Sequence, residues 1–219
     1  MNKNPSCKIY LFRHGETANS TEVCFNGHFD VELSGKGKNQ FREWAQVFKE
    51  ESFTAIYSSN LARTRISAKI LGEPHQLEPI AYSELRELCF GDWEGLSVTQ
   101  VEEKYPNQLE ERMKNIEAFK VDGGETFWQL QERVVAMFEK IVSRHSNEKI
   151  AMVCHGGVNR VILSHLLEIP IKRIFRIKQD YADLNIIQYY GNEPVVELVG
   201  GAAENSYIPQ SGDKKIAIQ

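Results

Sequence analysis

The chain is organised around the stretch Ile9-Tyr10-Leu11-Phe12-Arg13-His14-Gly15-Glu16-Thr17. An apolar run that favours β-structure ends abruptly at a cation, an imidazole and a glycine, which is typical of a buried strand opening into a turn. In open α/β sheets, ligands bind beyond the carboxyl ends of the strands. Arg13 and His14 are therefore expected at a ligand site. Imidazole can be a nucleophile, a base or a metal ligand there, and a guanidinium favours an anionic substrate.

A second strand is predicted over residues 54–57. It is followed by the polar cluster Ser58-Ser59-Asn60, which we expect to cap a helix that runs to about Leu71. Arg63 falls in the first turn of that helix. The pattern of a buried strand ending beside a cation therefore occurs twice.

A third strand is predicted over residues 149–154, and His155-Gly156-Gly157 follows it directly, ahead of another helix. The loop over residues 83–95 contributes Glu87. If these strand ends lie side by side, two imidazoles, two guanidiniums and a carboxylate converge on one crevice. The helix that begins after the glycines would also direct backbone N–H groups toward a bound anion.

Amphipathic helices alternate with these strands. Ser34 is expected to cap a helix with apolar side chains at i, i+3, i+4 and i+7, which are Phe41, Trp44, Ala45 and Phe48. The clearest helix follows Gly123-Gly124 and runs to about His145, and residues 184–199 favour a terminal hairpin. This order predicts a three-layer α/β/α sandwich with a mostly parallel sheet and helices on both faces.

The length of 219 residues is that of one domain, which we predict over residues 1–199, with a loose tail over 200–219. A hydrophobic content of 42% with 26% charged residues is typical of a soluble protein, and the net charge of −4 argues against nucleic acid or an anionic membrane as partner. The four cysteines show no C-x-x-C spacing, and the polar N-terminus is unlike a signal peptide. We therefore expect a cytoplasmic location. A homodimer is left open.

The residue set suits phosphoryl transfer through a phosphohistidine. Guanidinium forks bind a tetrahedral dianion and stabilise charge on its equatorial oxygens. A neutral imidazole attacks phosphorus in line while an acid protonates the departing oxygen, and water then hydrolyses the phosphoenzyme with the former acid acting as base.

These motifs together resemble those of the histidine phosphatase superfamily, the phosphoglycerate-mutase-like proteins. Four segments from about residue 8 to 190 carry the resemblance in the family's order: 11–17, 57–64, 85–95 and 155–157. The resemblance implies that His14 is the nucleophile and Glu87 the proton donor. It also implies that the transferring phosphoryl group is bound by Arg13, Arg63 and His155, with the backbone at Gly156 as a further donor.

The resemblance implies a reaction on a small phosphorylated metabolite that needs neither a metal nor a cofactor. One position departs from the family's pattern. An asparagine that contacts phosphate is expected shortly after the first motif, but Asn19 lies one residue early and Ser20 occupies the expected place. Either side chain could donate a hydrogen bond, so both are candidates for binding phosphate.

The segment after the acid separates a phosphatase from a mutase. Similar mutases carry a long basic insertion there, whereas only a short helical stretch lies between Gly95 and Gly123, with Arg112 and Lys114 as its notable cations. This favours hydrolysis and the branch that contains α-ribazole phosphatases and broad-specificity phosphatases, with α-ribazole 5′-phosphate as the specific substrate candidate. The alternatives are a cofactor-dependent phosphoglycerate mutase and a non-catalytic module that binds a phosphorylated metabolite.

Other groups in these segments have more ordinary interpretations. Asp92 and Glu94 compete with Glu87 for the acid role, and only the motif separates them. Cys154 is expected to be a core thiol, because successive strand residues point to opposite faces. Trp93 is expected to anchor its loop. Two arginines are predicted to be structural ion-pair partners and four histidines to be surface or core residues: Arg133, Arg160, His28, His75, His145 and His165.

Overall fold

A computed structural model describes residues 5–203 of the protein. Its strands are β1 (Pro5–Arg13), β2 (Phe53–Ser59), β3 (Ile80–Tyr82), β4 (Glu148–Cys154), β5 (Leu184–Tyr190) and β6 (Glu193–Gly201). They form a six-stranded sheet in the order β3-β2-β4-β1-β5-β6. The first four strands in this order pair in parallel. Strand β5 pairs antiparallel with both of its neighbours, β1 and β6. The predicted mostly parallel sheet is confirmed, and so is the terminal hairpin.

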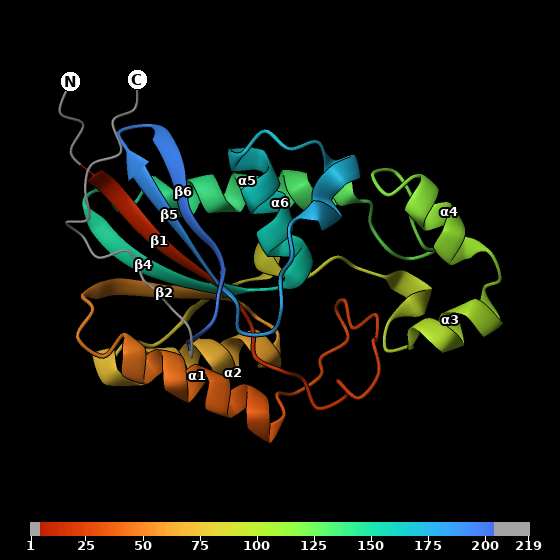
Figure 1. The fold of residues 1–219 in the computed structure, drawn as a ribbon, viewed down its shortest axis with the longest axis horizontal. Helices are drawn as coiled ribbons and strands as arrows, with labels where there is room; N and C mark the ends of the chain where they lie inside the picture. The colour runs from red at the N-terminus through yellow and green to blue at the C-terminus, as the bar shows by residue number, and fades with distance from the viewer. Residues whose placement is uncertain (1–4, 204–219) are drawn as a thin grey trace.

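Helices cover both faces of the sheet, as the alternation of strands and helices predicted (Figure 1). On one face lie α1 (Gly35–Val47) and α2 (Ala62–Gly72), and on the other α5 (Phe127–Val142) and α6 (Gly156–Leu166). Two short helices project at one end of the sheet, α3 (Val98–Lys104) and α4 (Gln108–Lys114). Four 3₁₀ turns complete the described part of the chain: η1 (Glu73–His75), η2 (Ser83–Leu85), η3 (Gly91–Trp93) and η4 (Ile171–Arg176).

Alternating side chains of β1 supply both halves of the core. Ile9 and Leu11 are fully buried under α5 and α6, whereas Tyr10 and Phe12 pack on the opposite face with the aromatic stripe of α1. Burying an apolar side chain of this size contributes about 1.5–3 kcal/mol. The central strand is therefore fixed on both faces, and its carboxyl end is held in a defined place.

A third apolar cluster lies apart from the two that cover the sheet. Its fully or nearly buried members are Trp93, Val101 and Val121, and partly buried aromatic rings surround them. Trp93 is inaccessible to solvent and packs 5.1 Å from the ring of Phe25 and 5.6 Å from that of Phe119. Its predicted role as a loop anchor is confirmed.

The N-cap of α1 could be predicted from the local sequence, whereas the N-cap of α2 could not. The Ser34 hydroxyl accepts from the backbone N–H of Gly37 at 3.0 Å, as predicted. The predicted cap of α2 by residues 58–60 is wrong. That helix starts after Leu61, and its first N–H, on Ala62, donates to the Asp30 carboxylate at 2.7 Å. The capping oxygen comes from a loop 32 residues upstream.

The end of the chain differs from the expected division. Residues 200 and 201 belong to β6, so the predicted tail begins too early, and its remainder from residue 204 onward lies outside the described residues. Helix α5 ends at Val142, three residues before the predicted end at His145. Across residues 5–203, no helix has the length and apolar character needed to cross a lipid bilayer.

Candidate active site

Three chemistry-bearing strand ends lie side by side. Strands β2, β4 and β1 are consecutive neighbours in the sheet, so their carboxyl ends meet at one edge. The N–H of His14 donates to the carbonyl of Cys154 at 3.0 Å, which joins the ends of β1 and β4 directly. The convergence predicted from the sequence is therefore observed.

The imidazole of His14 is held with one nitrogen free for chemistry. Its ring is 5% exposed, and Nδ1 lies 2.8 Å from the Gly15 carbonyl oxygen. A carbonyl can only accept, so Nδ1 carries the proton and Nε2 keeps its lone pair. Burial, followed by the positive charges of Arg63 and Arg13, holds the pKa of His14 well below its ordinary value. The imidazole of His14 is therefore neutral, the form that a nucleophile requires.

His155 lies beside it and is fully buried. The two rings are 5.2 Å apart at 66°, and Nε2 of His155 lies 2.8 Å from the Ser59 hydroxyl. Its Nδ1 is buried without a hydrogen-bond partner. Burial, followed by the positive charge of Arg63, lowers the pKa of this ring as well. A buried nitrogen without a partner is costly, so Nδ1 is suited to a hydrogen bond with a bound ligand.

Two guanidiniums are fixed here by backbone carbonyls rather than by carboxylates. Arg63 is 1% exposed and donates to the carbonyls of Phe29 at 2.9 Å and Gly27 at 2.6 Å. Arg13 donates to the Gln179 carbonyl at 2.7 Å and lies 4.1 Å from the Tyr181 ring centroid. Neither forms an ion pair within the described part of the chain, so the positive charge of both is available to an anion.

Glu87 reaches the same cluster from the loop after β3. One carboxylate oxygen accepts from the Gly157 N–H at 2.9 Å and the other from the Leu88 N–H at 2.8 Å. A Cβ at Gly157 would lie 2.3 Å from the carboxylate, so only glycine permits this approach. The first turn of α6 thus holds the acid. The backbone N–H of Gly157 was expected to point toward a bound anion. It donates instead to the Glu87 carboxylate.

Arg133 fixes the loop that carries Glu87. It donates to the carbonyls of Glu84, Arg86 and Glu87 at 2.7–2.9 Å and pairs with the Glu125 carboxylate. Glu125 in turn accepts from the N–H of Cys89 at 2.9 Å. Arg133 is the structural ion-pair partner that the sequence predicted. Its position shows that the ion pair holds the acid in place.

Comparison with known proteins agrees with this geometry. The family model of the histidine phosphatase superfamily (branch 1) matches residues 9–201. The chain belongs to the histidine phosphatase superfamily.

Named relatives of this histidine phosphatase include both phosphatases and mutase-like proteins. It is 30% identical over 180 residues to phosphoserine phosphatase 1 of Hydrogenobacter thermophilus, covering 82% of this chain and 85% of that protein. It is 33% identical over 156 residues to phosphoglycerate mutase-like protein 4 of Arabidopsis thaliana, covering 70% and 68%. The α-ribazole phosphatase structure from Shigella flexneri shares the fold, with a TM-score of 0.82 and 22% identity over 89% of this chain and 96% of that one.

The histidine phosphatase keeps Asn19 and Ser20 within the loop after β1. The Asn19 amide exchanges hydrogen bonds with that of Asn26 at 2.7 and 3.2 Å and accepts from Thr17 Oγ1 at 3.0 Å. The hydrogen bond from Lys36, with a smaller contribution from one donated by Ser20, lowers the pKa of Glu16. The contacts found for both predicted phosphate ligands are therefore to their own loop. None of them is to His14 or Arg63.

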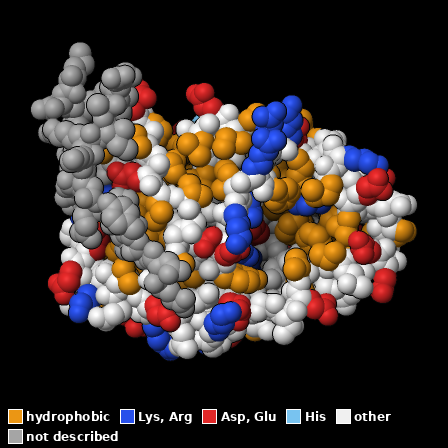
Figure 2. Space-filling model, viewed as in Figure 1, with side chains coloured by type: hydrophobic (Ala, Val, Ile, Leu, Met, Phe, Trp, Pro, Cys, Tyr) orange, Lys and Arg blue, Asp and Glu red, His pale blue; other side chains and the backbone are white. Residues whose placement is uncertain are grey.

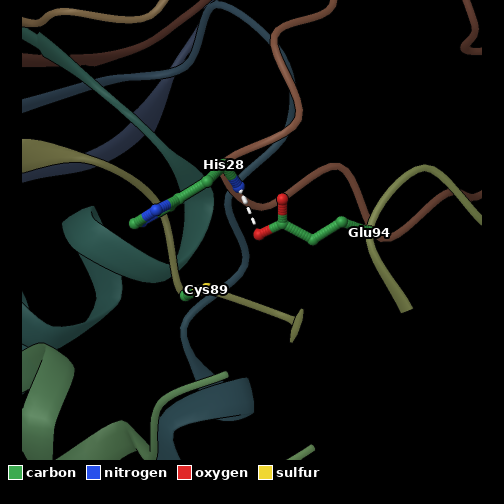
Figure 3. A group of neighbouring side chains, drawn as sticks. All are labelled: His28, Cys89 and Glu94. Atoms are coloured by element: carbon green, nitrogen blue, oxygen red, sulfur yellow. Dashed lines mark hydrogen bonds between the residues drawn. The ribbon is translucent and has the colours of Figure 1, made fainter. Parts of the chain in front are cut away.

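Glu94 and His28 have structural roles, and Figure 3 shows the hydrogen bond between them. One oxygen of Glu94 accepts from the N–H groups of His28 at 2.7 Å and Phe90 at 3.2 Å, so Glu94 holds the loop. His28 Nε2 donates to the Glu87 carbonyl at 2.9 Å. His28 was assigned from the sequence only as a surface or core residue, and no nearby motif indicated this contact.

His28, Cys89 and Glu94 also form a group of candidate metal ligands, with one ligand atom from each lying within 4.8 Å of the others. All three residues already form hydrogen bonds that stabilise the acid loop. His28 and Glu94 form those given above, and Cys89 Sγ donates to the Gly123 carbonyl at 3.6 Å. The group contains none of the residues predicted to carry out the reaction. It is better explained as the fastening of the acid loop.

The remaining sequence assignments divide in two. Cys154 is fully buried in the core, as predicted, and burial raises the pKa of its thiol. Three histidines lie away from the site, as predicted: His75 beside Phe53, His145 beside Tyr57 and His165 beside Glu139. Arg160 forms no ion pair within residues 5–203, contrary to the prediction, and donates instead to the Ile177 carbonyl at 2.8 Å.

Proposed function

We propose that this enzyme hydrolyses small phosphomonoesters through a phosphohistidine at His14, with Glu87 as the proton donor and with no metal or cofactor. One observation carries the proposal. The free Nε2 of a buried neutral imidazole lies among two guanidiniums that have no carboxylate partner and beside a second imidazole with an orphaned nitrogen. This arrangement is matched to a dianion that is attacked by an imidazole.

In the first step, the phosphoryl group of the substrate lies between Arg13 and Arg63, with His155 Nδ1 as a further contact. Nε2 of His14 attacks phosphorus in line, the P–N bond forms and the bond from phosphorus to the ester oxygen breaks. Protonated Glu87 gives its proton to that departing oxygen, which leaves as an alcohol. The guanidiniums stabilise the charge that spreads over the equatorial oxygens.

In the second step, the Glu87 carboxylate takes a proton from water, whose oxygen attacks the phosphohistidine. The P–N bond breaks, and inorganic phosphate and neutral His14 are restored. The backbone N–H of Gly156 is a further phosphate donor in this proposal. Asn19 or Ser20 would have to leave its present partners to serve as one.

The proposed substrate is a small phosphorylated metabolite, and we place the enzyme in the cytoplasm. Two observations support hydrolysis over the mutase reaction. The relative from Hydrogenobacter thermophilus is named a phosphatase, and only the short helices α3 and α4 lie between the acid loop and Gly123. The resemblance in sequence motifs gave α-ribazole 5′-phosphate as the specific candidate substrate. The similar fold of the Shigella flexneri α-ribazole phosphatase is consistent with a small phosphomonoester as substrate.

The test is hydrolysis of p-nitrophenyl phosphate in excess EDTA by the wild type, His14→Ala and the control His165→Ala. We expect turnover that survives chelation, is retained in the control and falls at least about 10³-fold in His14→Ala, because no phosphoenzyme can form. Radiolabelled substrate should leave an acid-labile phosphoryl label on the wild type and on His165→Ala, but not on His14→Ala.

Other outcomes identify the alternatives. Loss of turnover in EDTA would indicate a metallohydrolase. Phosphate binding without turnover of any ester would indicate a binding module, and isomerisation of phosphoglycerate a mutase. Retention of activity in His14→Ala would contradict the assignment of His14 as the nucleophile.

A further inference from the structure

A tight turn lies between the acid loop and the arginine of α2 that is proposed to bind the phosphoryl group. The Asn26 carbonyl accepts from the N–H of Phe29 at 2.7 Å and closes this turn, whose central residues are Gly27 and His28. Gly27 has a φ of 47°, and a Cβ there would lie 2.6 Å from a carboxylate oxygen of Glu94. The turn therefore depends on glycine at this position.

On one side, the turn holds Arg63 through its backbone. The guanidinium donates to the carbonyls of Gly27 and Phe29, the two residues that flank His28. The next residue, Asp30, caps the N-terminus of α2 directly before Arg63. None of these hydrogen bonds uses the imidazole of His28, so they should remain when that side chain is changed.

On the other side, the imidazole of His28 holds the acid loop. Its Nε2 donates to the Glu87 carbonyl at 2.9 Å, while the backbone N–H of His28 donates to Glu94 at 2.7 Å. Figure 3 shows the ring extending away from Glu94, so one residue reaches two parts of the loop. Arg133 donates to the same Glu87 carbonyl, but it lies in α5. His28 thus joins this carbonyl to the turn that holds Arg63.

Polar contacts rather than apolar burial set the place of this turn. Phe29 is 52% exposed, and neither it nor His28 belongs to the three apolar clusters of the described residues. Figure 2 shows hydrophobic side chains exposed at the end of the molecule where α3 and α4 project. A segment with little core packing is held by its hydrogen bonds, so the loss of one should displace the groups that it connects.

We infer that His28 is a positioning residue that sets the place of the Glu87 carboxylate relative to Arg63. The inference rests on the proposed function and adds to it a residue outside the four motif segments. When the ester bond breaks, the departing oxygen takes its proton from the acid while the equatorial oxygens stay bound to the guanidiniums. The two groups must therefore keep a fixed separation. A displaced acid would slow proton transfer and leave phosphate binding unchanged.

The experiment measures kcat and KM of the His28 variants on glycerol 3-phosphate and p-nitrophenyl phosphate. For His28→Ala we expect kcat on the alkyl ester to fall at least about tenfold, because its leaving group needs the proton, and kcat on the nitrophenyl ester to change less than about threefold. The inhibition constant of inorganic phosphate should stay within about threefold, because backbone carbonyls alone hold Arg63.

Two amides separate the hydrogen bond from the bulk of the side chain. His28→Gln can place an N–H near the position of Nε2 and should recover most of the lost kcat. His28→Asn is too short to do so and should lose as much as His28→Ala, which it replaces if that variant fails to fold.

The matched control is His165→Gln, the same substitution at a histidine that pairs with Glu139 away from the site. It should behave as the wild type on both esters. The bond from Arg86 to Asn60 at 2.6 Å keeps the acid loop attached beside α2 without the imidazole of His28. The variants should therefore fold, which urea unfolding checks.

A double-mutant cycle tests whether His28 acts through the acid. In a Glu87→Gln background, His28→Ala should lower kcat on glycerol 3-phosphate by less than about twofold. Additive losses, equal losses on the two esters, a loss confined to KM, or wild-type kinetics in His28→Ala would each overturn the inference. Failure of the proposed function gives a different result, because hydrolysis by the otherwise unchanged enzyme would then not depend on His14 or Glu87.

Discussion

Two buried histidines on the same side of the sheet are each bonded through Nε2 to a hydroxyl of strand β2, but they are completed differently. Tyr57 lies 2.7 Å from Nε2 of His145, whose Nδ1 bonds to the Glu148 carboxylate at 2.6 Å. Ser59, two residues further along the strand, lies 2.8 Å from Nε2 of His155, whose Nδ1 has no partner. One imidazole is satisfied at both nitrogens and the other at only one.

The charges around the two histidines follow the same division. Near the amino ends of the strands, Lys149 pairs with Glu51 at 2.6 Å and Lys8 with Glu197 at 3.0 Å. At the carboxyl ends, Arg13 and Arg63 are held by backbone carbonyls alone. Groups that find all their partners within the chain stabilise the fold, whereas groups left incomplete are available to a ligand. This difference distinguishes the surroundings of His155 from those of His145 independently of any motif.

The largest effect that would sharpen the comparison concerns the acid. Glu87→Gln should reduce hydrolysis of an alkyl phosphate such as glycerol phosphate by roughly 10²–10³-fold, because an alkoxide leaves poorly without a proton. The loss on p-nitrophenyl phosphate should stay below roughly tenfold, since nitrophenolate leaves unaided. The measurement is kcat/KM on both substrates, with the exposed Glu84→Gln on the same loop as the control. Equal losses on both would contradict the assignment of Glu87 as the acid.

Matched hydroxyl deletions on β2 would test the two histidines directly. Ser59→Ala removes the group that positions His155 and should lower kcat/KM roughly 10- to 100-fold, since small displacements of catalytic groups are costly. Tyr57→Phe leaves Nε2 of His145 buried and unpaired and should cost about 1–3 kcal/mol of unfolding free energy while activity is retained. Urea unfolding and kinetics on both variants provide the test. The comparison fails if Tyr57→Phe is the variant that loses activity.

The smallest effect is on the pH dependence of stability. The pKa of His155 lies below its ordinary value of 6.5 in the folded protein, so the unfolded chain binds more protons below that pH. The free energy of unfolding should therefore fall as the pH drops below 6.5, with His155 contributing up to about 1.4 kcal/mol per pH unit. Urea unfolding between pH 7.5 and 5 should give a shallower fall for His155→Asn. An unchanged slope would show that His155 does not contribute in this way.

Much of this site could be predicted from the sequence because its parts occur at regular places. Buried strands are recognisable by their apolar runs, and parallel strands bring their carboxyl ends to one edge, so the residues after Phe12, Tyr57 and Cys154 had to meet. Ser34 was identified as a cap because it directly precedes the apolar pattern of α1. Local chemistry was sufficient in each of these cases.

Contacts between distant segments could not be predicted in this way. The cap of α2 is Asp30, and Ser59, expected as part of that cap, instead bonds to His155. His28 supports the Glu87 backbone from a loop 59 residues away. The guanidinium of Arg112 lies against the rings of Phe90, Phe127 and Phe175, which come from three separate segments. Their spacing in the sequence does not predict this contact. Such contacts depend on how loops pack, which periodicity and propensity do not specify.

The separate apolar cluster around Trp93 has a consequence for enzyme engineering. The α3–α4 segment contributes Val101 and Val121 to that cluster, and of its buried apolar side chains only Ile116 joins a cluster that covers the sheet. Its interior is therefore largely separate from the scaffold that holds the reacting groups. Residues 96–122 are therefore a natural unit for exchange between related enzymes. A chimera that keeps Phe25, Trp93 and Val121 would retain the apolar contacts on which the exchanged segment packs. New selectivities could then be installed by swapping one contiguous block while the chemical machinery stays untouched.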